Sequence, residues 1–187
     1  MTSRRDAPAP EVGPRMRRRN CAGRMRPTAL GAPCLQTDAI RKELFSAADL
    51  TANYGSGRYS PDQRGAVYEE LERRMVAALR DSVTVVLDGT FTRHLQRERV
   101  AALALQAGAS VLFVHCHCPL EVAQDRVADR AVHGPTLSDI RPAMLADQAR
   151  EEEPFYGIDL VLELDTTENV ASLLQEVLQY VRDVIPL

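Results

Sequence analysis

Short runs of apolar residues alternate along the chain with longer stretches in which apolar positions recur at helical spacing. The runs have the length of strands, and most of the stretches between them have the length of helices. The expected strands are 32–36, 83–87, 111–114 and 160–164. The expected helices are 39–45, a long one from residue 61, 93–107, one from 119, one after 138 and one from 170. This alternation predicts parallel βαβ units, and therefore an α/β fold in which helices cover both faces of a parallel sheet in three layers.

Residues that begin helices support several of these boundaries. Ser60 and Pro61 fit the N-cap and first position of the long helix, and Thr37 and Asp38 fit the cap of the helix before it. The apolar stripe of the long helix is Val67, Leu71, Met75 and Leu79. The run Val83–Leu87 is almost wholly apolar, which predicts a strand that is buried on both faces.

Charge divides the chain of 187 residues into two parts. Residues 1–26 hold eight arginines against Asp6 and Glu11, a local charge of +6, and show no apolar period. The remainder carries 15 basic and 24 acidic side chains, a net charge of −9. We therefore expect a disordered segment rich in arginine and proline at 1–28 and one domain at 29–187, which is long enough to bury a core without disulfides or structural metal.

Composition also bears on location and partners. No apolar run approaches the roughly 18 residues that span a bilayer, and the first 27 residues lack the hydrophobic centre of a secretory signal. Four cysteines in a chain of this length fit a reducing compartment, so we expect a cytoplasmic protein with no membrane partner. The basic segment could bind nucleic acid or another polyanion, but arginine-rich termini often lack a specific partner, and nucleic acid binding is not the favoured interpretation.

Carboxylates follow two of the expected strands, each with basic residues close behind. Asp38 and Arg41 come after the first strand, and Asp88, Thr90 and Arg93 come after the second. Parallel strands end at one edge of a sheet, where ligands bind. An aspartate there can hold magnesium or accept a proton from an attacking hydroxyl, and an arginine can bind anionic oxygens. The alternative is that the two aspartates only cap a helix and a turn.

Two arginines lie four residues apart in the helix expected from residue 119. Arg126 and Arg130 share a face of that helix and could reach one site, or they could pair in solvent with Asp125 and Asp129. The stretch 131–137 after them contains a glycine and a proline. An arginine-bearing helix that leads into such a connection is what a lid over phosphates requires.

The run from His115 to Cys118 alternates two histidines with two cysteines, which raises the question of a metal site. In an extended segment the histidines lie on one face and the cysteines on the other, and no second ligand pair follows at zinc spacing. We therefore expect no metal there.

Five separated blocks, taken together, resemble a known family. They are 35–44, 59–61, 85–91, 114–116 and 126–130. In this order they resemble the AAA-type P-loop small-molecule kinases, a group similar to gluconate kinase, zeta toxin, chloramphenicol phosphotransferase and polynucleotide kinase. The resemblance covers residues 30–187. It implies a P-loop NTPase kinase fold, ATP and Mg²⁺ as cofactors, and an aminoglycoside phosphotransferase-like partner domain in some members.

The resemblance also implies roles for individual residues. Asp38 would orient or deprotonate the acceptor hydroxyl, and Asp88 would help to position magnesium. Arg41, with Thr90 and Arg93, would bind the acceptor. Arg126 and Arg130 would be lid arginines on the migrating phosphoryl group, whose transition state is stabilised by positioning and charge. Asp165 and Thr166 match a turn that lies near the nucleotide base.

One part of the family pattern is absent. Gly-x-x-x-x-Gly-Lys-Ser/Thr, whose amides and lysine hold the phosphates, occurs nowhere in the sequence, and the single lysine, Lys42, lies outside such a loop. Residues 1–27 stand where the missing strand and loop belong, and we interpret them as an out-of-frame or misassigned start. The missing strand would lie between the strands at 83–87 and 111–114. Those strands could close on each other, the basic segment or another chain could supply a strand, or the protein could be only marginally stable.

The sequence thus predicts an ATP-binding kinase-like protein that transfers the γ-phosphoryl group to a hydroxyl of a small molecule or nucleotide, with donor binding impaired here. The alternative is a non-catalytic remnant that binds a partner through an open sheet edge or through the basic segment.

Overall fold

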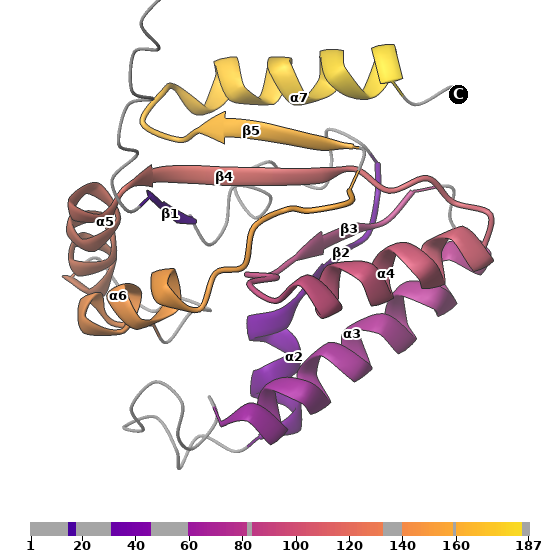
Figure 1. Cartoon of the computed structure of the whole chain (residues 1–187), viewed down its shortest axis with the longest axis horizontal. Helices are drawn as coiled ribbons and strands as arrows, with labels where there is room; N and C mark the ends of the chain where they lie inside the picture. The colour runs from indigo at the N-terminus through magenta and orange to yellow at the C-terminus, as the bar shows by residue number, and fades with distance from the viewer. Residues whose placement is uncertain are drawn as a thin grey trace, which may run out of the picture.

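The computed structural model describes residues 15–17, 31–45, 60–81, 84–132, 140–158 and 160–184. In these residues strands and helices alternate as the sequence predicts (Figure 1). The strands are β1 (Arg15–Arg17), β2 (Cys34–Gln36), β3 (Val86–Asp88), β4 (Phe113–Pro119) and β5 (Val161–Asp165). The helices are α2 (Thr37–Leu44), α3 (Pro61–Asp81), α4 (His94–Gln106), α5 (Leu120–Val132), α6 (Pro142–Arg150) and α7 (Val170–Val184). The predictions for residues 46–59 and 133–139 lie outside the described residues.

The strands form two separate sheets. β2 and β3 pair in parallel, and β4 pairs in parallel with β5 on one side and antiparallel with β1 on the other. Within the described parts of the chain, β3 and β4 are not neighbours, so the expected central strand between them is not replaced by their direct pairing. The basic segment supplies a short strand instead, because Met16 of β1 lies opposite Cys118 of β4.

The divided sheet alters the burial of its apolar strands. Val86 and Leu87 of β3 are only half-buried, and Val114 of β4 is 36% exposed. The prediction that the strand at 83–87 is buried on both faces is therefore wrong for its described residues. The physical reason is that β3 has one strand neighbour in the described structure, whereas a strand inside a parallel sheet has two.

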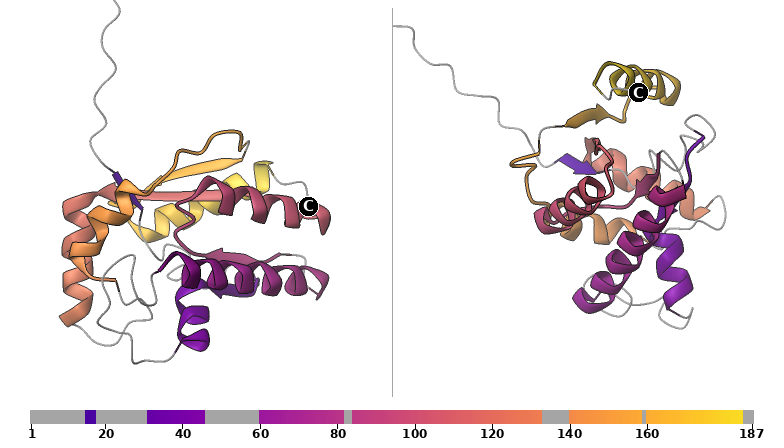
Figure 2. Two further views of the ribbon diagram at one scale, coloured as in Figure 1. Left: turned by 60° about the horizontal axis from the view of Figure 1, so that its bottom comes forward. Right: turned by 90° about the vertical axis from the view of Figure 1, so that its right-hand side faces the viewer.

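The hydrophobic core is divided into clusters in the same way as the strands are divided into two sheets. One cluster lies under β2 and β3 and is built from α2, α3 and α4, and a second packs α7 against β4 and β5. A third cluster joins Cys118 of β4 to α5 and α6. In Figures 1 and 2, β4, β5 and α7 lie on one side of the molecule, with β2, β3, α2 and α3 on the other. The arrows of β4 and β5 point towards α5 and α6, which therefore flank the carboxyl ends of these strands (Figure 1).

Two helix starts test the predicted caps. The Ser60 hydroxyl accepts a hydrogen bond from the Gln63 backbone N–H at 3.4 Å, and α3 begins at the following proline, as predicted. α2 begins earlier than predicted, at Thr37, and its N-cap Gln36 makes no side-chain cap bond. Asp38 is therefore not the cap of α2; its carboxylate lies in the first turn and pairs with Arg41 instead.

None of the helices in the described residues is both long enough and apolar enough to cross a membrane.

Gly89 is required by a close approach rather than by its backbone angles. A Cβ atom there would lie 2.8 Å from Thr37 Cγ2 and 3.3 Å from Phe91 Cε2. We expect Gly89→Ala to lower the free energy of unfolding by about 1–3 kcal/mol, the usual cost of overpacking. The measurement is urea denaturation followed by circular dichroism.

Gly65 provides the matched control for this substitution. It lies inside α3 with open space around its Cα, so Gly65→Ala should leave stability unchanged or raise it by about 0.5–1 kcal/mol. Equal effects of the two substitutions would contradict the packing argument.

Candidate active site

The two predicted aspartates lie at adjacent strand ends. Asp88 ends β3, opposite Gln36 of β2, and is 8% exposed. The Gln36 Nε2 amide donates a hydrogen bond of 2.9 Å to Asp88 Oδ2. Asp38 follows in the first turn of α2 and forms an ion pair with Arg41, and both side chains are buried. Both aspartates therefore lie at the carboxyl edge of the β2–β3 sheet, as the strand order predicts.

The pKa of the Cys34 thiol is affected by the burial and the negative charge at this edge of the sheet. Burial raises the pKa of its thiol to about 11, and the negative charge of Asp88 contributes to the same shift. Both causes act against the thiolate, because a buried anion beside another anion is disfavoured.

This shift gives a prediction for alkylation. We expect the rate of Cys34 modification by iodoacetamide to rise with pH around a midpoint of about 11, and Asp88→Asn to move that midpoint down. The shift is downward because the substitution removes a negative charge that opposes the thiolate. Mass spectrometry of the modified peptide separates Cys34 from the other cysteines. An unmoved midpoint in Asp88→Asn would show that the Asp88 carboxylate does not act on the thiol.

A pocket of about 360 Å³ is lined by Arg41, the ion-pair partner of Asp38, and by Thr90, which follows Asp88 in the loop after β3. It is formed by the starts of α3 and α4, by the loop after β3, and by one residue each from α2 and α6. The lining residues in the described part of the chain are Arg41, Pro61, Arg64, Gly65, Tyr68, Thr90, Thr92, Arg93, Leu95, Gln96 and Gln148. The structure thus brings together Arg41, Thr90 and Arg93, the three residues predicted to bind the acceptor.

The Tyr68 side chain holds in place the part of the pocket lining that contains Thr90. Its hydroxyl lies 3.3 Å from Thr90 Oγ1 and accepts a hydrogen bond of 3.0 Å from the Phe91 backbone N–H. The rings of Tyr68 and Phe91 meet edge to face with centroids 5.3 Å apart. Phe91 has a φ of 43°, a left-handed conformation that costs a non-glycine residue about 1–2 kcal/mol. The Tyr68 contacts help to hold this turn in place.

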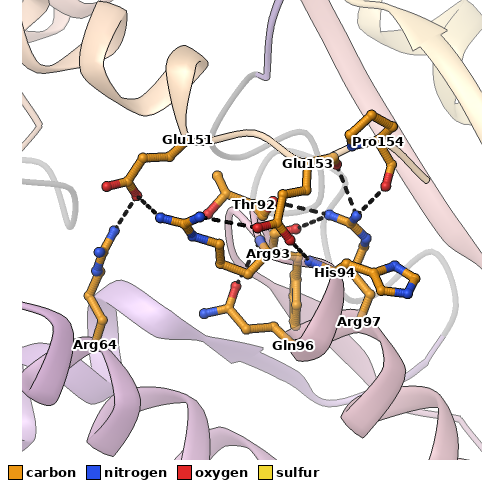
Figure 3. Close-up of polar contacts among 10 residues, drawn as sticks. Arg64, Thr92, Arg93, His94, Gln96, Arg97, Glu151, Glu153 and Pro154 are labelled. Atoms are coloured by element: carbon orange, nitrogen blue, oxygen red, sulfur yellow. Dashed lines mark hydrogen bonds and ion pairs between the residues drawn. The ribbon is translucent and has the colours of Figure 1, made fainter. Parts of the chain in front are cut away.

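A fully buried arginine ties the same turn to the segment that follows α6 (Figure 3). Arg97 Nη1 donates to the carbonyls of Phe91 and Thr92 at 2.7 and 3.3 Å, and Nη2 donates to those of Glu153 and Pro154 at 2.9 and 2.6 Å. Its guanidinium carbon lies 4.3 Å from the centroid of the Phe155 ring. The planar fork of one side chain thus joins two segments about 60 residues apart.

Two glutamates of that segment contact arginines of the pocket (Figure 3). Glu151 Oε2 lies 2.5 Å from Arg64 Nη1 and 3.7 Å from Arg93 Nη2. Glu153 Oε1 lies 3.1 Å from Arg93 Nη1, and its other oxygen accepts a hydrogen bond of 2.6 Å from the His94 backbone N–H at the start of α4. The backbone hydrogen bond from His94, followed by the Arg93 guanidinium, lowers the pKa of the Glu153 carboxyl. Both carboxylates therefore position pocket arginines without lining the pocket themselves.

The predicted lid arginines lie on α5 and do not line the pocket. Arg130 Nε donates to the Arg126 carbonyl at 3.2 Å, and Arg126 Nη1 is buried without a hydrogen-bond partner among the described residues. Their placement on one helix face is as predicted, and their role on a phosphoryl group stays a prediction.

The predicted nucleotide-base turn follows β5. Thr166 is fully buried, and both its hydroxyl and its backbone N–H donate to the His117 carbonyl, at 3.0 and 2.8 Å. Asp165 Oδ1 is exposed and accepts bonds from the backbone and hydroxyl of Thr167. Thr166 thus joins β5 to β4, and base contact at this turn stays a prediction.

The run of histidines and cysteines is extended throughout, as part of β4. The rings of His115 and His117 lie 5.8 Å apart on one face, while Cys116 and Cys118 enter two apolar clusters. His115 contacts Glu152 at 3.1 Å and Glu163 at 2.6 Å. The described residues contain no group of three or more His, Cys, Asp or Glu side chains suited to hold a metal ion.

The chemistry of the site fits Mg²⁺ better than it fits the phosphates of ATP. Asp88 offers a carboxylate at a strand end, which is a suitable magnesium ligand. Phosphates need a glycine-rich amide cradle and a lysine, and the sequence has no such motif. Its single lysine, Lys42, is an exposed residue of α2. No phosphoryl-transfer step can therefore be derived from these residues.

Residues 22–155 match the model of a family described as an AAA domain. The match covers more than half of the chain, and the protein belongs to this family, as the sequence resemblance indicated. Two curated relatives are uncharacterized proteins of Mycobacterium tuberculosis and Mycobacterium bovis, each 30% identical over 124 residues. The match covers 64% of this chain but 25% of each relative, so the chain spans about a quarter of the length of these relatives.

Solved kinase structures have a similar fold. A gluconokinase from Sinorhizobium meliloti is 18% identical with a TM-score of 0.65, and the likeness covers 87% of this chain and 83% of that one. A sugar kinase from Janibacter is 16% identical with a TM-score of 0.61, over 83% and 82%. The Mycobacterium tuberculosis APS kinase CysC, in complex with AMPPNP and APS, is 20% identical with a TM-score of 0.53, over 86% of each chain. The fold is therefore that of the P-loop kinases, an α/β fold whose kinase members bind nucleotides.

Proposed function

We propose that this chain is a P-loop kinase-like domain whose pocket binds the phosphoryl acceptor, a hydroxyl-bearing small molecule or nucleotide, and whose grip on ATP is impaired. The observation that carries the proposal is the meeting of Arg41, Thr90 and Arg93 in one pocket beside two buried aspartates. A hydroxyl acceptor needs a carboxylate near the hydroxyl and polar groups that fix its orientation. The names of the similar structures, a gluconokinase and a sugar kinase, favour a hydroxyl-bearing acceptor.

In this proposal the residues divide between acceptor and donor. Asp38 orients the acceptor hydroxyl, and its partner Arg41 reaches the pocket. Asp88 is the magnesium ligand at the neighbouring strand end. Arg126 and Arg130 belong to a lid that approaches the donor phosphates. The donor side lacks its phosphate loop, so we expect ATP to bind weakly.

Calorimetry of Mg-ATP with the full chain tests the donor side. We expect weak binding that depends on magnesium and that Asp88→Asn weakens by about tenfold, the effect of losing one charge-assisted contact. Asp62→Asn is a matched control, because Asp62 is an exposed residue of α3 outside the pocket lining. Equal binding to wild type and to Asp88→Asn would contradict the assignment of Asp88.

The second candidate is a non-catalytic domain that binds a partner. The divided sheet favours it, because one edge of β3 has no strand neighbour in the described structure. Absence of ATP binding, together with nucleic acid affinity that falls steeply with salt and is lost on deletion of residues 1–26, would support this candidate.

We also propose a partner domain for this chain. The curated relatives are about four times longer than the matched region, and we propose that an aminoglycoside phosphotransferase-like domain is joined to this one.

A further inference from the structure

The lining of the pocket is positively charged. Arg41, Arg64 and Arg93 line it from three different elements or their flanks, and none of the described lining residues is acidic. The rest of the lining contains hydroxyl and amide groups at Tyr68, Thr90, Thr92, Gln96 and Gln148. Guanidinium groups bind carboxylates and phosphates, while hydroxyl and amide groups form hydrogen bonds with ligand hydroxyls. A volume of about 360 Å³ lies near the lower end of the range for small-molecule sites, so the ligand is small.

The carboxylates that balance these arginines are not among the described lining residues. Glu153 is held at the start of α4 by the His94 backbone, and Asp38 lies within α2. Glu151 is different, because a single oxygen, Oε2, lies 2.5 Å from Arg64 and 3.7 Å from Arg93. The Glu151 carboxylate thus pairs closely with Arg64 at the start of α3 and more distantly with Arg93 at the start of α4, whose nearer partner is Glu153 at 3.1 Å (Figure 3).

This geometry is that of an internal counter-ion. A carboxylate or phosphate group in the pocket would carry two or three oxygens and could accept from Arg64 and Arg93 together at short distances, whereas Glu151 Oε2 lies 2.5 Å from Arg64 but 3.7 Å from Arg93. Partly exposed ion pairs of this kind contribute little to stability, so their exchange costs little. The arrangement therefore favours a ligand that brings its own negative charge.

We propose that the pocket selects an anionic, hydroxyl-bearing small molecule, and that its carboxylate or phosphate group displaces Glu151 from Arg64 and Arg93. The inference rests on the proposed function, because it names the chemical class of the acceptor in the same pocket. It adds two residues that the sequence did not single out, Arg64 as a binding residue and Glu151 as its competitor.

Three sugars with the same ring test whether the pocket prefers an anionic ligand to a neutral one. D-glucose is neutral, D-glucuronate carries a carboxylate at C6, and D-glucose 6-phosphate carries a phosphate there. Each is titrated at low ionic strength into the full chain without nucleotide, and binding is followed by ¹H–¹⁵N NMR, including the Nε–H signal of Arg64. We expect at least one of the anionic sugars to bind about tenfold or more tightly than glucose, as one charge-assisted hydrogen bond provides. The tighter of the two identifies the anionic group.

Variants separate the roles of the two new residues. Arg64→Gln should weaken binding of the anionic sugar about tenfold, while Glu151→Gln should strengthen it several-fold because the competing carboxylate is removed. Arg80→Gln is the matched control, since Arg80 is exposed on the same helix α3 and lies outside the pocket lining. It should bind like the wild type. Circular dichroism and thermal midpoints confirm that each variant is folded.

The outcomes distinguish this inference from the function on which it rests. Equal binding of glucose and both anionic sugars, with signals that shift at the pocket, would overturn charge selection and leave an acceptor pocket in place. Binding that is unaffected by Arg64→Gln, or no binding by any of the three sugars, would overturn the inference. Donor binding is measured separately with Mg-ATP and Asp88→Asn, so failure there does not alter the result of the sugar titrations.

Discussion

Arg97→Met should be the most destabilising single substitution among those considered, lowering the free energy of unfolding by about 3 kcal/mol. The guanidinium is fully buried and donates to four backbone carbonyls. Methionine fills a similar volume but leaves these carbonyls without that donor, and each hydrogen bond from a charged donor contributes about 1.5–3 kcal/mol. Removing the buried charge recovers part of its desolvation cost, which keeps the net loss below the sum of the four bonds. Since domains are stable by only about 5–15 kcal/mol, the loss is a large fraction of the total.

Urea denaturation of the full chain, followed by circular dichroism, measures this loss. Arg97→Lys should recover only part of it, because a single ammonium cannot match the planar fork that spans both segments. Arg80→Met makes the same chemical change at an exposed position and should stay within about 1 kcal/mol of the wild type. Limited proteolysis of Arg97→Met should also cut within 151–155 more readily. Stability within 1 kcal/mol of wild type would show that Arg97 does not hold the two segments together.

Sequence reasoning located the aspartates and one wall of the pocket because both follow from strand order. Asp38 and Asp88 come directly after strands that pair in parallel, so their proximity follows once β2 and β3 are neighbours. Thr90 and Arg93 follow from the same strand end. The start of α3 was also predictable, because Ser60 and the proline after it determine the first turn locally. These features depend on short-range sequence or on one pairing.

The contacts around Arg97 depend on long-range packing and were missed. A signal was present, because Arg97 lies on the same helical stripe as the buried Val100 and Ala104. An arginine at a core-facing position requires several acceptors. Residues 151–153 are three consecutive glutamates, a run typical of a solvated face, yet Glu151 and Glu153 reach pocket arginines while Glu152 reaches His115 on β4. No periodic pattern in the sequence predicts which residue each of these three glutamates contacts.

The arrangement of the two sheets could not be predicted either. The apolar pattern of the expected strands indicates how many faces they can bury, but not which chain segment completes the sheet. Residues 15–17 contain a single apolar side chain between two arginines, which is too little to predict a strand, and β1 pairs with β4 in an antiparallel register. Backbone hydrogen bonding is available to any non-proline sequence, so a strand can form there without a side-chain signal. Val86, Leu87 and Val114 are left half-buried or exposed because that short strand does not fill the centre of a parallel sheet.

Replacing residues 1–28 with a buried strand followed by Gly-x-x-x-x-Gly-Lys-Ser and the first turn of a helix should tighten Mg-ATP binding by at least about a hundredfold. The loop adds backbone amides that cradle the phosphates and a lysine that reaches them. Two charge-assisted hydrogen bonds are enough for a factor of about one hundred, and the loop supplies more than two. Calorimetry on the chimera and on the natural chain provides the comparison.

The same chimera tests the gap in the sheet, because the grafted strand belongs between β3 and β4. A parallel strand there would take the edge of β4 that β1 now occupies and would give β3 its second neighbour. We therefore expect the thermal midpoint to rise together with the affinity for ATP. Exchanging the grafted lysine and serine for alanine should abolish most of the gain in affinity but keep the gain in stability, since the strand is unchanged. A stable chimera that binds Mg-ATP no more tightly than the natural chain would show that the missing phosphate loop is not what limits nucleotide binding.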